Sequence, residues 1–188
     1  MIKPEIRVLG VDDGAFTSHV EGQVPVIGVV FRGGYWLEGV IHTEIAVDGF
    51  DATERISSMI TSSSHYNQLR VIMLNGITFA GFNIVDVKAL TETTKLPVIT
   101  VTREKPDLDE IHKALHNLSQ SEERWQMILS AGEPVEVVTR DTNVTVYVQT
   151  AGVSIENAKK ILRLTSTRSN TPEALRVAHL IASGISGL

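Results

Sequence analysis

The order of the apolar segments constrains the fold of this chain more than any other feature. Three β-rich runs come first, at residues 6–12, 25–33 and 35–47 (IRVLGVD, PVIGVVFRG and YWLEGVIHTEIAV). The Arg32-Gly33-Gly34 segment between the second and third runs is typical of a hairpin turn. These runs therefore predict an antiparallel meander.

The pattern then changes to alternating helices and strands. Asp51 followed three residues later by Glu54 is typical of a capped helix start and predicts a helix to about Thr61. A strand at 69–74, a helix from about Asn83 to Thr94 and a strand at 97–101 are expected next. Such alternation implies parallel strands joined by right-handed crossovers.

The last third of the chain predicts helices around a second hairpin. Residues 108–131 have a helical pattern, and 134–140 and 144–150 form a predicted hairpin closed at 141–143. Ser154 is expected to cap one helix, and Thr171-Pro172-Glu173 to open another. No repeat or linker interrupts the 188 residues, so we expect one domain, residues 1–188, with a mixed sheet and helices on both faces.

Composition narrows the classes of function. The absence of cysteine excludes disulfides, zinc-thiolate sites and cysteine nucleophiles. A net charge of −5 argues against bulk binding of nucleic acid by a uniformly basic surface, although residues 151–188 hold five Lys or Arg against two Glu. No apolar run approaches the ~20 residues that span a bilayer, so a cytoplasmic protein without membrane contact is expected.

Several polar residues stand where predicted strands or helices begin or end. Asp12 and Asp13 close the first strand, and Asn75 closes the strand at 69–74. Each has an ordinary structural explanation: Asp-Gly and Asn75-Gly76 are turn sequences, Asp51 with Glu54 forms a capping box, and a histidine such as His179 is commonly packed or half-exposed. Taken singly, none indicates a site.

Taken in order, these residues resemble endonuclease V, and more closely its mainly archaeal relatives known as domain of unknown function 99. VLGVDDGAF resembles the first-strand motif of endonuclease V, which assigns the metal-binding aspartate to Asp12. GFDATE resembles the segment that ends in the catalytic glutamate of that family, here Glu54, which precedes Asn75 by the family's spacing. The resemblance implies a ribonuclease H-like fold, whereas periodicity alone also allows other mixed α/β sheets.

The second half of the chain continues the resemblance. LPVITVTREK resembles the next strand and its basic end, with Arg103 where the family has lysine. The segment from VYVQTAGVS to ALRVAH resembles the closing helices, in which His179 matches the last polar position.

The chain also departs from the endonuclease V pattern. Asn75 replaces an aspartate, Gly81 stands near where a histidine is found, and Ala46-Val47-Asp48-Gly49 replaces an aromatic-proline wedge. The first change weakens a metal site, and the last removes a device for recognising a deaminated base. The resemblance therefore does not imply inosine specificity here.

The resulting hypothesis is a metal-dependent endonuclease of nucleic acid, either DNA or RNA, that uses Mg²⁺ or Mn²⁺. The implied catalytic residues are Asp12, Glu54 and His179, and the implied metal ligands are Asp12, Glu54 and Asn75, with Asp86 and other aspartates as possible replacements for the missing carboxylate. The expected substrate contacts are Arg103, Lys105, Gly76, Phe79 and Phe82, although both phenylalanines are equally well explained as core residues. The alternative is a catalytically weakened or inactive nucleic-acid-binding module on the same fold.

Overall fold

The computed structural model describes residues 2–17, 20–140 and 144–186. Within them, no helix is long and apolar enough to cross a membrane. The strands are β1 (Arg7–Asp13), β2 (Gln23–Arg32), β3 (Trp36–Ala46), β4 (Val71–Asn75), β5 (Thr78–Phe79), β6 (Asn83–Ile84), β7 (Val98–Thr102), β8 (Val135–Val138) and β9 (Thr145–Ala151). The helices are α1 (Ala52–Thr61), the 3₁₀ helix η1 (Tyr66–Gln68), α2 (Val87–Thr94), α3 (Leu108–Leu115), α4 (Ser121–Ser130), α5 (Ile155–Thr165) and α6 (Glu173–Ser186).

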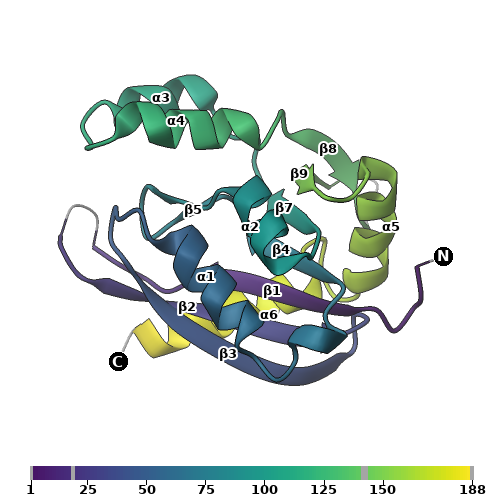
Figure 1. Cartoon of the computed structure of the whole chain (residues 1–188). Helices are drawn as coiled ribbons and strands as arrows, with labels where there is room; N and C mark the ends of the chain where they lie inside the picture. The colour runs from purple at the N-terminus through teal and green to yellow at the C-terminus, as the bar shows by residue number, and fades with distance from the viewer. Residues whose placement is uncertain (1, 18–19, 141–143, 187–188) are drawn as a thin grey trace.

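Seven of the strands form one mixed sheet in the order β3-β2-β1-β4-β7-β9-β8 (Figure 1). The first three strands are antiparallel neighbours, as the meander predicted, and β1, β4 and β7 are parallel. The second hairpin, β8 and β9, joins the sheet through an antiparallel pairing of β9 with β7. The predicted closing residues, 141–143, lie outside the described residues.

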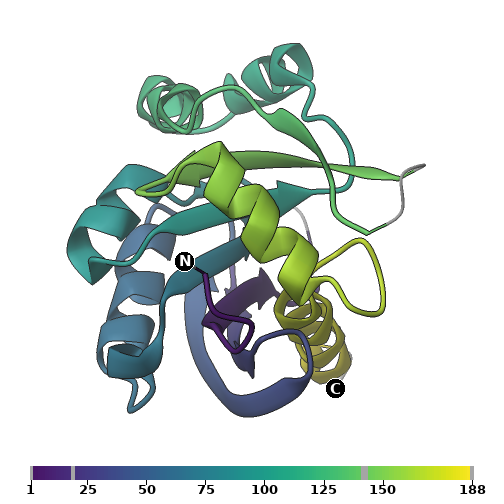
Figure 2. The same cartoon turned by 90° about the vertical axis from the view of Figure 1, so that its right-hand side faces the viewer.

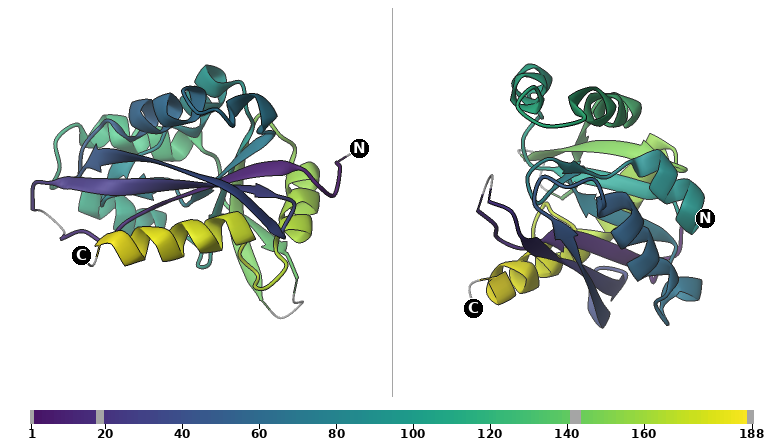
Figure 3. Two further views of the ribbon diagram at one scale, coloured as in Figure 1. Left: turned by 90° about the horizontal axis from the view of Figure 1, so that it is seen from below. Right: turned by 60° about the vertical axis from the view of Figure 1, so that its left-hand side comes forward.

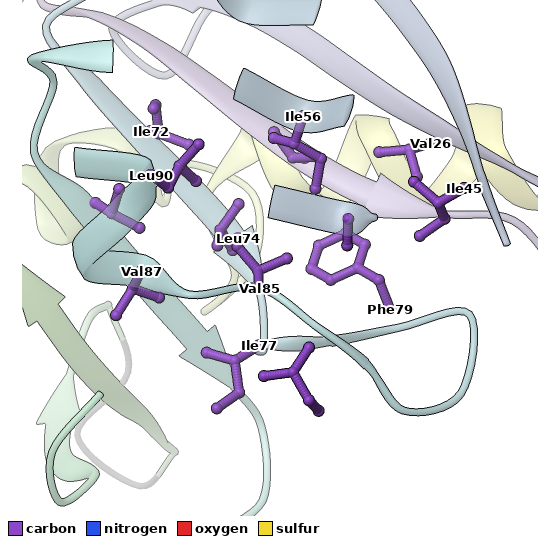
Figure 4. Packing of buried hydrophobic residues seen from close by; sticks show 14 of the residues in the cluster. Val26, Ile45, Ile56, Ile72, Leu74, Ile77, Phe79, Val85, Val87 and Leu90 are labelled. Carbon is purple, nitrogen blue, oxygen red and sulfur yellow. The ribbon is translucent and has the colours of Figure 1, made fainter. Parts of the chain in front are cut away.

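Helices cover both faces of this sheet, as predicted. Figure 3 shows α1 and α6 on opposite sides of the strands, and Figure 2 shows α5 and α6 on the same side. Successive side chains of β1 point to opposite faces of the sheet, so alternate residues pack against different helices. Leu9 and Val11 join the core under α1 and α2, whereas Val8 belongs to the core under α5 and α6. Figure 4 shows part of the first core, in which Ile56 of α1 and Leu90 of α2 pack near Leu74 of β4.

Small residues let α6 approach the sheet closely. A Cβ added to Gly10 would lie 2.3 Å from the carbonyl carbon of Ala174, and one added to Gly14 would lie 2.0 Å from the Ser186 hydroxyl oxygen. Gly10, Asp12 and Gly14 are alternate residues that face the same way. The helix therefore runs along this line of β1 with only glycine hydrogen atoms between the two backbones at Gly10.

The structure corrects two predicted element boundaries. The helix expected from Asn83 begins at Val87, because Asn83 belongs to the short β5–β6 hairpin and Asp86 is the N-cap, accepting hydrogen bonds from the amides of Lys88 and Ala89. The helical stretch at 108–131 is two helices, broken before Ser121 where Gln120 adopts a φ of 55°.

The structure also corrects the predicted cap of α1. Asp51 makes no side-chain capping bond to this helix. Its Oδ1 instead accepts from the Ala46 amide and from Asn83 Nδ2. Asn83 in turn accepts from the Ala52 amide at 2.9 Å, which fixes the start of α1 beside β6.

A buried arginine joins the α3–α4 pair to the loops at the end of the sheet. Arg124 is 2% exposed and donates to the carbonyl oxygens of Asp48, Gly49, Phe82 and Ser119. Five N–H groups in a fixed fork suit this role, because several loop carbonyls are satisfied by one side chain. The loops at 46–51 and 80–83 are thereby held in one arrangement.

Candidate active site

The candidate site is centred on Asp12, which is 2% exposed at the end of β1. Asp12 Oδ1 accepts a hydrogen bond from the Asp13 amide at 3.0 Å and another from Asn75 Nδ2 at 3.1 Å. Its Oδ2 lies 2.9 Å from His179 Nδ1. A buried carboxylate requires such partners, since burying an unpaired charge is costly.

His179 comes from the opposite end of the chain. It lies on α6, and its side chain is 59% exposed although Nδ1 contacts the buried Asp12. The close packing at Gly10 and Gly14 sets the height of α6 above the strand, which places the imidazole at the Asp12 carboxylate. The ring is therefore anchored through one nitrogen while much of it faces solvent.

Asn75 reaches the cluster from β4, the parallel neighbour of β1. Carboxyl ends of adjacent parallel strands meet at one edge of a sheet, where ligand sites are common. Gly76 follows with a φ of 79°, a left-handed conformation that favours glycine. The structure thus brings Asp12, Asn75 and His179 together.

Asp13 lies beside the cluster but points to the other face of β1. Its Oδ2 accepts from the Ala80 amide at 2.7 Å. Burial raises the pKa of the Asp13 carboxyl to about 6, and the negative charge of Asp12 adds to the increase, while the hydrogen bond from Ala80 opposes it. Two adjacent carboxyls therefore have different environments, one bound to an imidazole and one to a backbone amide.

A cleft of about 800 Å³ opens in front of the cluster, between the ends of β4 and β7 on one side and α6 on the other. Asn75 and His179 line it, together with two of the predicted substrate contacts, Arg103 and Lys105. Its remaining charged lining residues are Arg176, Glu104, Asp107 and Glu110. Positive and negative groups are thus equal in number along the wall, apart from His179.

Among the described residues, no hydrogen bond or ion pair joins Glu54 to Asp12, Asn75 or His179, so its place in the site stays a prediction. Glu54 is exposed in the first turn of α1, which packs on the face of the sheet opposite α6. Its helix begins at the same edge of the sheet, because Ala52 is bonded to Asn83 of β6. In the part of the chain that the structure describes, no group of three His, Cys, Asp or Glu is arranged to hold a metal ion.

The remaining predicted residues fall into two groups. Phe79 is fully buried in the core under α1 (Figure 4), so the prediction that it contacts substrate is wrong and its explanation as a core residue is confirmed. Asp86 caps α2 and does not replace the missing carboxylate of the cluster. Phe82 is partly buried against the same core, and its role as a substrate contact stays a prediction, as does that of Gly76.

Comparisons with known proteins show the family to which the chain belongs. The sequence pattern described as Endonuclease dU matches residues 4–186. The chain belongs to the Endonuclease dU family. A UPF0215 protein of Methanosarcina acetivorans is 53% identical over 184 residues, which cover 98% of this chain and 92% of that protein.

Solved structures extend the likeness to the fold. A crystal structure of a protein of unknown function from Archaeoglobus fulgidus superposes with a TM-score of 0.86 at 38% identity, covering 96% of this chain and 98% of that one. Endonuclease V of Ciona intestinalis, crystallised with a 24mer DNA that contains an inosine followed by a ribo-adenosine, gives a TM-score of 0.57 at 14% identity, covering 92% and 82%. The predicted ribonuclease H-like fold, shared with endonuclease V, is confirmed.

Two charged residues of α6, Glu173 and Arg176, were not predicted as site residues from the sequence. Glu173 is 2% exposed at the start of α6, and Arg176 is bonded to it through two guanidinium nitrogens. The hydrogen bonds from Arg176 to Glu173 raise the pKa of the arginine further. The spacing of three residues on one helix was a signal, but it is equally typical of an exposed helical ion pair.

Proposed function

We propose that the protein is a nuclease-like phosphodiesterase that acts on nucleic acid, with the Asp12–His179 pair at its centre. One observation carries the proposal: a buried carboxylate holds an exposed imidazole at the rim of a cleft that also presents arginine and lysine. The Endonuclease dU family and the fold shared with endonuclease V support this reaction class.

The Asp12–His179 pair can orient a base for attack on phosphorus. An ionised carboxylate only accepts hydrogen bonds, so in the neutral imidazole this contact requires the proton on Nδ1 and leaves the lone pair of Nε2 available. A histidine oriented in this way can take a proton from a water within hydrogen-bond reach of Nε2. The water oxygen then bonds to phosphorus as the P–O bond to the leaving alkoxide breaks. The alkoxide takes a proton from solvent, and the imidazolium returns its extra proton to solvent. Asp12 acts through His179 and therefore is a positioning residue in this scheme.

Cationic side chains of the cleft would receive the phosphate. Arg103 and Lys105 follow β7 on the loop that lines the cleft, and both are exposed. Charge-assisted bonds to phosphate oxygens fix the position of a nucleic acid without reading its sequence. Such contacts suit both DNA and RNA.

The expected Mg²⁺ or Mn²⁺ ion does not fit the cluster as it is arranged. Mg²⁺ prefers carboxylate oxygens with several retained waters. Both oxygens of Asp12 are already bonded, and Asn75 presents its Nδ2 to Asp12 and contributes no charge. No step of the scheme is therefore assigned to a metal, and metal dependence stays a prediction to be tested with Glu54 as the second carboxylate.

The alternative is a nucleic-acid-binding module that has lost catalysis. The asparagine at position 75 favours it, because this end of β4 offers an amide where a nuclease of the endonuclease V pattern has a carboxylate. Such a module would bind nucleic acid with an affinity that falls with salt and would not cleave it.

A cleavage assay with purified protein separates the two. We expect His179→Ala to lower the cleavage rate of labelled DNA or RNA about a thousandfold, within the range for loss of a general base. Glu54→Ala should lower it comparably if the exposed carboxylate joins the site, and added chelator should then do the same. Binding measured in parallel should be unchanged in both variants. Cleavage that survives His179→Ala would contradict the proposal, and binding without cleavage by the parent protein would support the module.

A further inference from the structure

An ion pair between a buried glutamate, Glu173, and a partly exposed arginine, Arg176, precedes His179 on α6. Glu173 is 2% exposed, and Arg176 donates to it from Nε at 3.2 and 3.1 Å and from Nη2 at 2.8 Å. Arg168, on the loop before α6, approaches the same carboxylate at 3.7 Å with its side chain 72% exposed. A charge so well buried is kept only with good partners, and here two arginines share one glutamate.

Arg176 also lines the cleft that holds Asn75 and His179. Its side chain is 33% exposed, and the described residues provide no partner for its Nη1. The bidentate bond to Glu173 fixes the plane of the guanidinium. The edge that is not bonded to Glu173 remains available for a ligand.

The charge of the cleft makes such a fixed donor important. The cations Arg103, Lys105 and Arg176 are balanced in number by three acidic side chains, Glu104, Asp107 and Glu110. A wall of this kind attracts a polyanion weakly at long range, so binding depends on directed contacts at short range. Arg103 and Lys105 are exposed, whereas Arg176 is held in place by a buried carboxylate.

We propose that Arg176 is the phosphate anchor of the cleft and that Glu173 is the positioning residue that aims it. This inference rests on the proposed function for its substrate class, a nucleic-acid phosphate. The anchor lies on the same helix as His179, three residues before it, so the phosphate contact and the proposed base are set by one rigid element. Arg168 provides a comparison, because it shares Glu173 but does not line the cleft.

Fluorescence anisotropy with a labelled DNA oligonucleotide, single-stranded and as a duplex, tests the anchor in the full chain. Arg176→Gln should weaken binding about tenfold and lower the slope of log affinity against log salt by about one. Arg168→Gln removes the same charge and should change binding by less than about twofold. Equal effects of the two substitutions, or none from Arg176→Gln, would overturn the assignment.

Glu173→Gln tests whether Glu173 positions Arg176, because the two explanations predict opposite changes in DNA affinity. Removing a negative charge beside the cleft should tighten DNA binding if only overall charge matters, whereas loss of the aim should weaken it. Circular dichroism establishes that the variant is folded. If it is not, Glu173→Asp keeps the charge but shortens the side chain, so loss of the aim should weaken binding, whereas overall charge alone predicts no change. Tighter or unchanged binding in the folded variant would overturn the positioning role.

The binding readout also separates this inference from the proposed function. Arg176-dependent binding by a protein that does not cleave upholds the anchor and contradicts the phosphodiesterase. Cleavage that persists with unaltered binding in Arg176→Gln upholds the phosphodiesterase and contradicts the anchor. A parent protein that binds neither form of the oligonucleotide overturns the anchor.

Discussion

The two faces of β1 show how one strand serves two purposes. Toward α1 and α2 it presents Leu9 and Val11, both fully buried in a large apolar core, and then Asp13 against a loop amide. Toward α6 it presents Gly10, Asp12 and Gly14, so that a helix backbone lies nearly on the strand. The first face stabilises the fold by burying large apolar side chains. The second face has glycines in place of side chains, so α6 packs close to the strand and its His179 reaches Asp12.

The largest loss of stability is expected when a side chain is added to the face of β1 that packs against α6. In Gly10→Ala the new Cβ would meet the backbone of Ala174 and Leu175, which cannot rotate away as a side chain can. We expect a loss of about 3 kcal/mol in the free energy of unfolding, measured by urea denaturation. Gly22→Ala, where a Cβ meets nothing within 4 Å, is the control and should change stability by less than about 0.5 kcal/mol. Similar stabilities for the two variants would show that α6 is not tightly seated.

A smaller change in stability is expected from Asp13, on the face of β1 toward α1 and α2. Because the pKa of this carboxyl is raised to about 6 from 3.8, the folded protein binds a proton more tightly than the unfolded chain. Stability should therefore fall as pH rises from about 4 to about 7. Asp13→Asn, which can still accept from the Ala80 amide, should remove this fall. At about pH 8 the variant should be more stable by about 2 kcal/mol, and at about pH 4 it should match the parent in thermal unfolding. A variant that keeps the parent's pH dependence would contradict the assignment to Asp13.

The smallest effect should come from Asn75→Asp, which adds a carboxylate to the α6-face cluster. Without divalent ions the variant should lose about 1 kcal/mol, because Asp12 loses the amide donor and gains a like charge. Added Mn²⁺ or Mg²⁺ should raise the melting temperature more in the variant than in the parent, since the ion binds only the folded site. Equal metal affinity of the two proteins in calorimetry would show that residue 75 is only the end of a strand.

Much of the architecture followed from local pattern. The meander, the parallel βα units, the cap at Ser154 and the start of the last helix near Glu173 were predicted because period-2 and helical patterns, turns and caps are encoded over a few residues. The same local logic placed Asp12 and Asn75 at the ends of strands, and the resemblance to endonuclease V implied that they share a site. It misplaced the start of α2, because the β5–β6 hairpin is held by contacts to distant segments, such as Asn83 with Asp51.

Tertiary structure decided how the site residues combine. His179 reaches Asp12 across 167 positions of sequence only because glycines on β1 admit α6, and a pattern of neighbours cannot report that approach. Burial assigned Phe79 to the core and left Glu54 exposed in the first turn of α1, although both were candidate site residues in the sequence. In the sequence, Arg176 is one of several charged helix residues. Only the structure shows that its partner Glu173 is buried and that Arg176 lines the cleft. The sequence determined which chemical groups end each element, whereas packing of the two helix layers determined which of those groups lie together at Asp12 and along the cleft.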